Sequence, residues 1–113
     1  MKLSLIIPCY NEQDNIFPFF EATANAFKEL PKTIKSLEMI FVNDGSQDIT
    51  SQKLKELYSS YPSVVSVVEF SRNFGKEAGI YAGLQYATGD YICLIDADLQ
   101  QRPEVVRNMV EIL

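Results

Sequence analysis

Four short apolar runs alternate with stretches of helical periodicity along the 113 residues, and this alternation is the feature that most constrains the fold. The runs span residues 3–8, 37–42, 64–70 and 91–95. The first run is almost continuously apolar, as expected for a strand that is buried on both faces of a parallel sheet. Proline has no backbone donor for a sheet ladder, so we expect Pro8 to end this strand.

The stretches that follow the runs have apolar residues at three- and four-residue steps, which is the spacing of one face of an amphipathic helix. The first helix is expected to begin near residues 11–14, whose polar side chains are suited to capping free N–H groups. The third contains Gly79 and Gly83, so it can approach a sheet closely. A last helix is expected after Pro103.

Strands that are joined by helical crossovers lie parallel, and right-handed crossovers on both faces give a doubly wound sheet. We therefore predict an α/β fold with a Rossmann-like doubly wound parallel sheet and the strand order 3-2-1-4. In that order the chain reverses direction across the sheet between strands 1 and 4, and ligands of open α/β sheets bind outside the carboxyl ends at such a point. Residues 8–12 and 96–100 are expected to meet there.

The composition is that of a globular domain with one core, at 47% hydrophobic and 22% charged residues. A net charge of -5 argues against a nucleic-acid partner, because phosphate backbones are held chiefly by Lys and Arg clusters. A phosphate ligand would therefore need a bridging cation. The sequence has no histidine, so proton transfer would fall to carboxylates, Lys, Tyr or a thiol.

The two cysteines and the N-terminal segment bear on the compartment. Cys9 and Cys93 lack C-x-x-C spacing and lie in or beside apolar runs, which predicts reduced, buried thiols in a cytosolic compartment. The apolar stretch before Pro8 is too short for a signal peptide or a membrane span. We therefore expect a cytoplasmic location.

A candidate metal site follows the fourth run. Asp96 and Asp98 are separated by one residue at a strand end, so both carboxylates can point to one side, and Gln100 can continue the row. Such hard oxygen ligands suit Mg²⁺ or Mn²⁺, which also bind diphosphate oxygens. The alternative is that Asp98 only caps a turn and Asp96 is a solvated strand end. The position at the point of chain reversal favours the metal site.

Polar residues after the first two runs are candidates for a nucleoside pocket. Residues 44–46 could form only an Asx turn with a helix cap, but their place beside strand 1 favours contact with a nucleobase or ribose. Tyr10, Asn11 and Glu12 provide a ring with amide and carboxylate acceptors, as a nucleobase pocket requires. Capping and solvent exposure are the commoner roles of such residues.

Two cations, Arg72 and Lys76, flank Gly75 after the third run. They could be a surface charge pair of little energetic consequence. The functional alternative is that they lie near an anionic ligand, for which the chain offers few other cations in this region.

Four segments, which contain the candidate residues described above, resemble the motifs of family 2 inverting glycosyltransferases with the GT-A fold. They occur in the family's order and read IIPCYNE (6–12), VNDGS (42–46), RNFGKE (72–77) and DADLQ (96–100). The last two resemble the polyisoprenyl-phosphate branch, which includes dolichol-phosphate mannose synthase-like and bactoprenol glucosyltransferase-like enzymes. The resemblance extends over residues 3–113.

The resemblance implies roles for individual residues. Four of them would line the nucleoside pocket, namely Pro8, Tyr10, Glu12 and Asp44. Asp96 would meet the ribose or the metal-bound phosphates, and Asp98 with Gln100 would complete the site for the divalent cation. Lys76 would lie near the nucleotide.

The resemblance also implies the reaction of the whole enzyme. A UDP- or GDP-linked sugar would donate its glycosyl group, with inversion, to a polyprenyl or dolichyl phosphate at the cytoplasmic face of a membrane. Residues 1–113 would be the donor-binding part of a catalytic domain whose catalytic base lies downstream, so we expect no catalytic residue in this chain, weak nucleotide binding at most, and no turnover. The sheet edge beside strand 4 would be left open to self-association.

The residues by themselves are also compatible with two other functions. A metal-dependent phosphohydrolase could use Asp96 as its nucleophile, although such enzymes usually carry the motif on their first strand. A non-catalytic nucleotide-binding module is the other alternative. No G-x-G-x-x-G or P-loop motif follows any run, which disfavours dinucleotide and P-loop functions.

Overall fold

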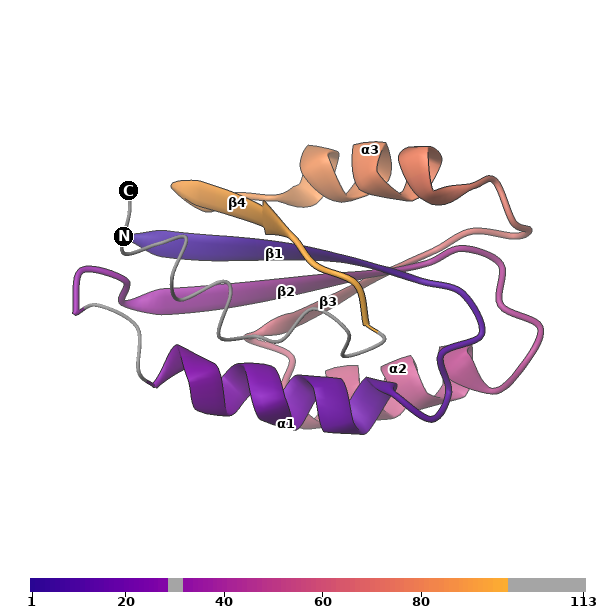
Figure 1. The fold of residues 1–113 in the computed structure, drawn as a ribbon, viewed down its shortest axis with the longest axis horizontal. Coiled ribbons are helices and arrows are strands. Elements are labelled where there is room, and N and C mark those ends of the chain that lie inside the picture. The colour runs from indigo at the N-terminus through magenta and orange to yellow at the C-terminus, as the bar shows by residue number, and fades with distance from the viewer. Residues whose placement is uncertain (29–31, 98–113) are drawn as a thin grey trace.

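In residues 1–28 and 32–97, which the computed structural model describes, four parallel strands form one sheet in the order β3-β2-β1-β4 (Figure 1). The strands are β1 (Lys2–Cys9), β2 (Ser36–Asn43), β3 (Val65–Glu69) and β4 (Tyr91–Leu94). The predicted strand order is confirmed. Its physical basis is that a helical crossover separates each strand from the next.

The helices cover both faces of the sheet, as a doubly wound fold requires. They are α1 (Ile16–Phe27), α2 (Thr50–Ser60) and α3 (Lys76–Tyr86). Helix α3 packs on one face against β1 and β2, whereas α1 and α2 lie together on the other face (Figure 1). The helix predicted after Pro103 lies outside the described residues.

Strand β1 is central and is buried on both faces, which explains its almost continuous run of apolar residues. Leu3, Leu5 and Ile7 alternate toward the core beneath α1 and α2. There the rings of Phe19 and Phe41 meet edge to face, with centroids 6.2 Å apart. This core holds the strand ends, and hence the loops that follow them, in register.

The opposite face of β1 is covered closely by α3, as its small residues predicted. A Cβ atom added to Gly83 would lie 2.5 Å from Cγ2 of Ile6. One added to Gly79 would lie 3.6 Å from Cγ1 of Val42, an ordinary contact. Gly83 therefore determines how near the helix comes to the sheet.

Pro8 does not end β1, contrary to the prediction, because its position in the sheet needs no donor. Alternate residues of a strand direct their backbone groups to the same side, and Ile6 directs its carbonyl to the β4 side, where it accepts from the Ile95 N–H at 3.1 Å. The register pairs Ile6 with Leu94, the last residue of β4, so the ladder on that side has ended before Pro8. Pro8 still pairs in register with Val42 of β2.

Both cysteines are buried and free, as predicted. Within the described residues, no helix combines the length and the apolar character needed to cross a bilayer.

Candidate functional site

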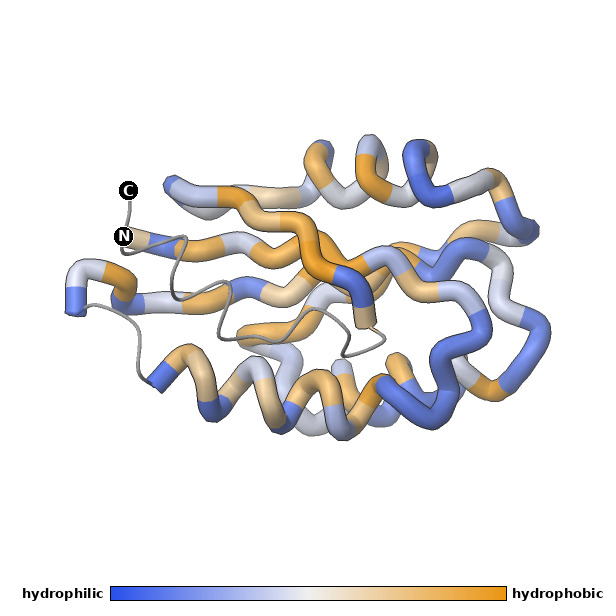
Figure 2. Tube along the Cα trace, in the orientation of Figure 1, coloured by the Kyte–Doolittle hydropathy of each residue, from blue (hydrophilic) through white to orange (hydrophobic). Residues whose placement is uncertain are grey.

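A pocket of about 290 Å³ opens where the carboxyl ends of β1, β2 and β4 meet the start of α3. In Figure 2 the loops that follow β1 and β2 are coloured mainly as hydrophilic. The residues that line the pocket are Pro8, Cys9, Tyr10, Glu12, Asp44, Asn73, Gly75, Lys76 and Asp96. The structure thus brings together all six residues predicted to bind substrate, whereas the predicted metal ligands Asp98 and Gln100 lie outside the described residues.

A larger hollow of about 660 Å³ lies between α1 and the amino-terminal part of β2. Its lining is mainly apolar, with Phe20, Leu37 and Tyr61 among its residues. A charged ligand is better served by the smaller pocket, because that pocket collects carboxylates and an ammonium group at strand ends.

The loop after β1 is held in place by the loop after β2. The Asn11 N–H donates to Oγ of Ser46 at 3.0 Å, and the Gln47 N–H donates in return to Oδ1 of Asn11 at 2.8 Å. The Glu12 N–H donates to Oγ1 of Thr50 at 3.0 Å. Asn11 has a φ of 52°, a left-handed conformation that Asn tolerates better than most residues. These contacts orient the neighbouring pocket residues.

The predicted capping of α1 by residues 11–14 is wrong. Helix α1 begins at Ile16 with Asn15 at its N-cap, and the Asn15 side chain makes no capping hydrogen bond. Instead, Nδ2 of Asn15 donates to Oε2 of Glu12 at 2.7 Å. The Asn11 side chain instead binds the loop after β2, and Glu12 lines the pocket. These tertiary contacts take the place of local capping.

Asp44 joins β2 to the loop that precedes α3. Its Oδ1 accepts from the Phe74 N–H at 2.7 Å, and its Oδ2 accepts from the Gly75 N–H at 3.0 Å. The residue is only 5% exposed although it borders the pocket. An Asx turn was one alternative predicted for residues 44–46. The structure has such a contact one residue earlier, where Oδ1 of Asn43 accepts from the Ser46 N–H at 3.3 Å.

Asp96 and Lys76 form an ion pair inside the pocket. The Lys76 Nζ atom lies 3.0 Å from Oδ1 and 3.3 Å from Oδ2 of Asp96. The Lys76 side chain is 62% exposed and that of Asp96 is 34% exposed. An ion pair of this exposure contributes only about 0–1 kcal/mol, so a ligand can replace either partner at little cost.

The Asp96 carboxylate supplies hard oxygen atoms of the kind that Mg²⁺ and Mn²⁺ prefer as ligands. Both of its carboxylate oxygens already contact a cation, the Lys76 ammonium. Among the described residues, no group of three or more His, Cys, Asp or Glu side chains is arranged to hold a metal. Mg²⁺ commonly binds through one or two carboxylates, substrate phosphates and water, so a sparse set of protein ligands suits it.

Cys9 lines the pocket but is not suited to act as a nucleophile. Burial raises the pKa of its thiol well above the usual range, and the negative charges of Glu12 and Asp96 add to this effect. The thiol donates to the carbonyl of Ile7 at 3.4 Å. It therefore stays protonated at neutral pH and packs as a small apolar group.

Three lining residues were not selected from the sequence, namely Cys9, Asn73 and Gly75. Each lies within one of the four motif segments of the sequence, and that position was the only indication that it could line the pocket. Arg72, which was selected as a possible cation for the ligand, does not line the pocket. Its guanidinium lies 4.5 Å from the centre of the Phe74 ring.

The similarity to known proteins extends over nearly the whole chain. The family described as Glycosyl transferase family 2 matches residues 4–113. The chain is 45% identical over 111 residues to a "prophage bactoprenol glucosyl transferase homolog" of Escherichia coli strain K12, covering 98% of this chain and 35% of that protein. It is 43% identical to the bactoprenol glucosyl transferase of Shigella phage SfX, with the same coverage. The chain thus spans about a third of the length of these curated relatives.

Two solved structures with a similar fold were determined with nucleotide sugars bound. The mannosyltransferase PcManGT of Pyrobaculum calidifontis, in complex with GDP-Man and Mn²⁺, has a TM-score of 0.71 and 26% identity, covering 96% of this chain and 31% of that one. TarS of S. aureus in complex with UDP-GlcNAc has a TM-score of 0.67 and 28% identity, covering 87% and 27%. The resemblance predicted from the sequence is confirmed.

Proposed function

The chain belongs to glycosyltransferase family 2, and on that premise we propose that its pocket binds a nucleoside-diphosphate sugar for transfer of the glycosyl group to a polyprenyl phosphate with inversion. One observation carries this proposal. Six residues from four separate segments line one pocket at the carboxyl ends of the strands, the place where open α/β sheets bind ligands. Its carboxylates and single lysine suit a diphosphate that arrives with a cation.

The proposed roles follow from the position of each side chain. Tyr10 is 42% exposed at the pocket, so its ring can stack on the base, and the Glu12 and Asp44 carboxylates can accept from base or ribose donors. Pro8 adds an apolar surface to the pocket lining. Lys76 would meet the diphosphate.

Asp96, together with Asp98 and Gln100, is proposed to hold Mg²⁺ or Mn²⁺. When bound, the cation would neutralise the charge that develops on the departing diphosphate. PcManGT was solved with both GDP-Man and Mn²⁺, which supports a cation-dependent donor site in this fold.

In the proposed transfer, an oxygen of the acceptor phosphate bonds to the anomeric carbon while the bond from that carbon to the diphosphate oxygen breaks. The bonding electron pair leaves with the nucleoside diphosphate, and attack from the opposite face inverts the centre. The acceptor is already anionic, so little proton transfer is needed. The residues of this chain bind and orient the donor, and none is proposed as the catalytic base.

The acceptor and the location are inferred from the relatives. Two of them are called bactoprenol glucosyl transferases or homologues, which supports a polyprenyl phosphate as the acceptor. Such a lipid is confined to a membrane, so we place the reaction at its cytoplasmic face, where nucleotide sugars are available.

We also propose that the chain self-associates through the edge beside β4. Ile92 and Leu94 on this strand are 43% and 50% exposed. An exposed apolar edge strand offers unpaired backbone groups to another chain. Sedimentation analysis should show concentration-dependent dimers, and a monomer at all concentrations would refute this part.

Calorimetric titration of the chain with UDP and with GDP, each with and without Mn²⁺, tests the donor site. We expect one diphosphate to bind, and to bind much more weakly without the cation. If neither bound under either condition, the proposal would be wrong. Release of phosphate from aryl phosphates would instead indicate the phosphohydrolase alternative.

A further inference from the structure

The loop formed by residues 70–75 leads into α3 and is attached to the end of β2. The Asp44 carboxylate accepts from two consecutive N–H groups of this loop, those of Phe74 and Gly75. The Asn73 side chain donates to the Asp44 carbonyl at 3.3 Å. The side chain and the backbone carbonyl of Asp44 therefore both hold a loop that follows another strand, β3.

The next residue of the turn allows this close attachment. Gly45 has a φ of 67°, and a Cβ atom there would lie 2.2 Å from the carbonyl carbon of Arg72 and 2.4 Å from the Asn73 nitrogen. The two backbones thus lie directly against each other. Any side chain at this position would push the loop away.

The start of the loop is also tied to β2, because the Phe70 N–H donates to the Asn43 carbonyl at 2.9 Å. The contacts nearer to α3, apart from those with Asp44, are weaker and more exposed. The Phe74 ring meets Phe70 edge to face at 5.5 Å and lies under Arg72, but Phe74 itself is 51% exposed. Exposed aromatic and cation–π contacts each contribute about 1 kcal/mol or less. Hydrogen bonds to a buried carboxylate are stronger, so the Asp44 contacts determine where the loop lies.

The position of this loop decides where Lys76 begins α3. Gly75 has a φ of 101° at the helix N-cap, and its carbonyl accepts from the Gly79 N–H at 3.2 Å in the first turn. Lys76 is the next residue, and its ammonium reaches Asp96, which also lines the pocket. A displaced loop would therefore displace the pocket's lysine.

From this chain of contacts we infer that Asp44 is a positioning residue for Lys76, in addition to any contact it makes with the nucleoside. It sets the distance between the lysine and Asp96 and hence the place at which a diphosphate meets positive charge. The part of this inference that concerns the diphosphate rests on the proposed function. The part that concerns Lys76 and Asp96 does not.

The ligand-free test is NMR of the lysine side chains in the chain with isotopic label. Asp96→Asn removes a charge from the pair and identifies the direction in which the Lys76 Hε and Nζ signals move when the contact is weakened. Asp44→Asn replaces one acceptor oxygen by an N–H donor that faces the loop amides, so it should move the same signals in the same direction and speed hydrogen exchange at Phe74 and Gly75. Asp90→Asn, at the opposite end of the sheet, is the control and should leave them unchanged. An unchanged Lys76 signal in folded Asp44→Asn would overturn the inference.

The second test is a double-mutant cycle on cation-dependent nucleotide binding. Asp44→Asn should weaken binding about tenfold in the wild-type background and by clearly less in the Lys76→Met background, where only a direct contact with the nucleoside remains to be lost, because the rest of the effect passes through the lysine. Equal losses in both backgrounds would show that Asp44 acts independently and would refute the inference. If the wild-type chain binds no nucleotide, the proposed function fails while the NMR test still decides the positioning role.

A milder variant covers the case in which Asp44→Asn does not fold, as judged by circular dichroism. Asn73→Ala removes one attachment of the loop and leaves the Asp44 carboxylate in place. It should shift the Lys76 signals in the same direction by a smaller amount. An unchanged signal in this variant would count against the inference in the same way.

Discussion

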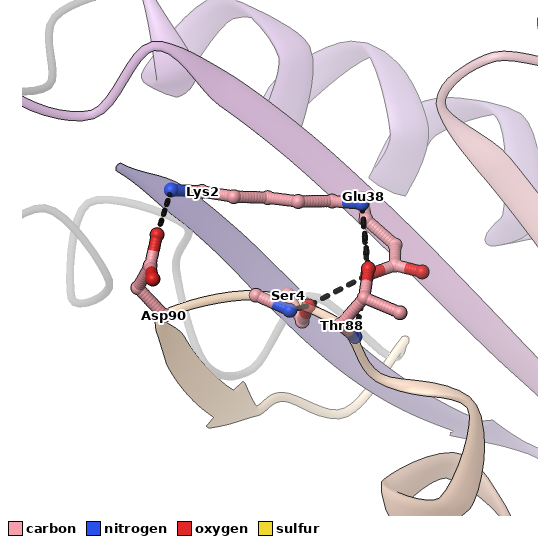
Figure 3. A network of polar contacts seen from close by, with 6 residues as sticks. Lys2, Ser4, Glu38, Thr88 and Asp90 are labelled. Carbon is pink, nitrogen blue, oxygen red and sulfur yellow. Dashed lines mark hydrogen bonds and ion pairs between the residues drawn. The ribbon is translucent and has the colours of Figure 1, made fainter.

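The two ends of the sheet both carry a carboxylate that connects separate segments, but the two carboxylates have different surroundings. At the amino ends of the strands, Oε2 of Glu38 accepts from Oγ of Ser4 at 2.7 Å and from the N–H and hydroxyl of Thr88 at 3.2 and 3.1 Å (Figure 3). The Lys2 ammonium lies 3.6 Å away. At the carboxyl ends, Asp96 contacts the ammonium of the exposed Lys76 and borders a pocket.

The difference shows how a structural carboxylate can be told from one that is available to a ligand. Partial burial would raise the pKa of Glu38, but the hydrogen bonds from Ser4 and Thr88 and the charge of Lys2 outweigh it and lower the pKa below its usual range. The hydrogen-bond donors to Glu38 are one backbone N–H and the hydroxyls of two short side chains, which have less freedom to move away than a long side chain has. The partner of Asp96 is such a long side chain, and it is exposed. We therefore expect changes at the amino end to alter stability and changes at the carboxyl end to alter binding.

The largest effect is expected for Asp96→Asn. Cation-dependent nucleotide binding should weaken about 100-fold or more, equivalent to about 2.7 kcal/mol, because the neutral amide is a poor ligand for a hard cation. The free energy of unfolding should change by less than about 1 kcal/mol, because the lost ion pair is exposed. Titration calorimetry and urea unfolding measure the two quantities. Asp90→Asn, which alters the acceptor for the Lys2 N–H, should leave binding intact.

Gly89→Ala should have the opposite profile. An added Cβ atom would lie 2.5 Å from Oγ of Ser4 and 2.8 Å from its backbone nitrogen, so the loop before β4 must move away from β1. We expect a loss of about 2 kcal/mol in the free energy of unfolding, with unchanged nucleotide affinity in the folded protein. Gly79→Ala is the matched control, because its Cβ atom would meet nothing closer than 3.6 Å. Similar losses for the two variants would contradict the role of the Gly89 contact.

Glu38→Gln should reduce stability by about 1.5 kcal/mol near neutral pH, through the loss of charge-assisted hydrogen bonds. The native pKa of Glu38 is lowered, so its contribution is present above the ordinary glutamate pKa of about 4.3 and is lost as pH falls through that value toward the native pKa. The stability difference between wild type and variant should therefore shrink on acidification. Urea unfolding at a series of pH values measures it, and a difference that did not depend on pH would contradict the explanation.

The smallest effect is expected at Tyr10. Tyr10→Ala should weaken nucleoside-diphosphate binding about tenfold through loss of stacking, and Tyr10→Phe should change it about twofold or less. Inorganic pyrophosphate has no base, so its affinity should be the same in all three proteins. A comparable loss for pyrophosphate would place Tyr10 near the phosphates instead and would change the orientation proposed for the nucleotide.

Much of this fold and site could be predicted from local patterns. The alternation of apolar runs and helical stretches determines the strands, and the handedness of crossovers then leaves few possible orders. The carboxyl ends of neighbouring parallel strands must lie at one edge, so Tyr10, Asp44 and Asp96 could be assigned to one site although they are distant in sequence. The small residues of α3 likewise predicted its close approach to β1, which the contact between Gly83 and Ile6 confirms.

Other features depended on partners that no local pattern identifies. Pro8 was expected to end β1, but it is accommodated because β4 stops pairing opposite Ile6. The loop of residues 11–14 was assigned to capping, but its side chains bind the loop after β2. Asp44 was assigned to a turn or to the nucleoside, and it holds the loop before α3.

The sequence by itself determined which segments are strands and helices, their order in the sheet and the edge at which the polar residues collect, because these follow from periodicity and chain connectivity. Only the tertiary structure decided which of those residues hold the loops and which remain open to a ligand. Hydrogen-bond partners from distant segments make that distinction. The sequence does not distinguish a carboxylate that accepts from two backbone amides, as Asp44 does, from one that faces an exposed lysine, as Asp96 does.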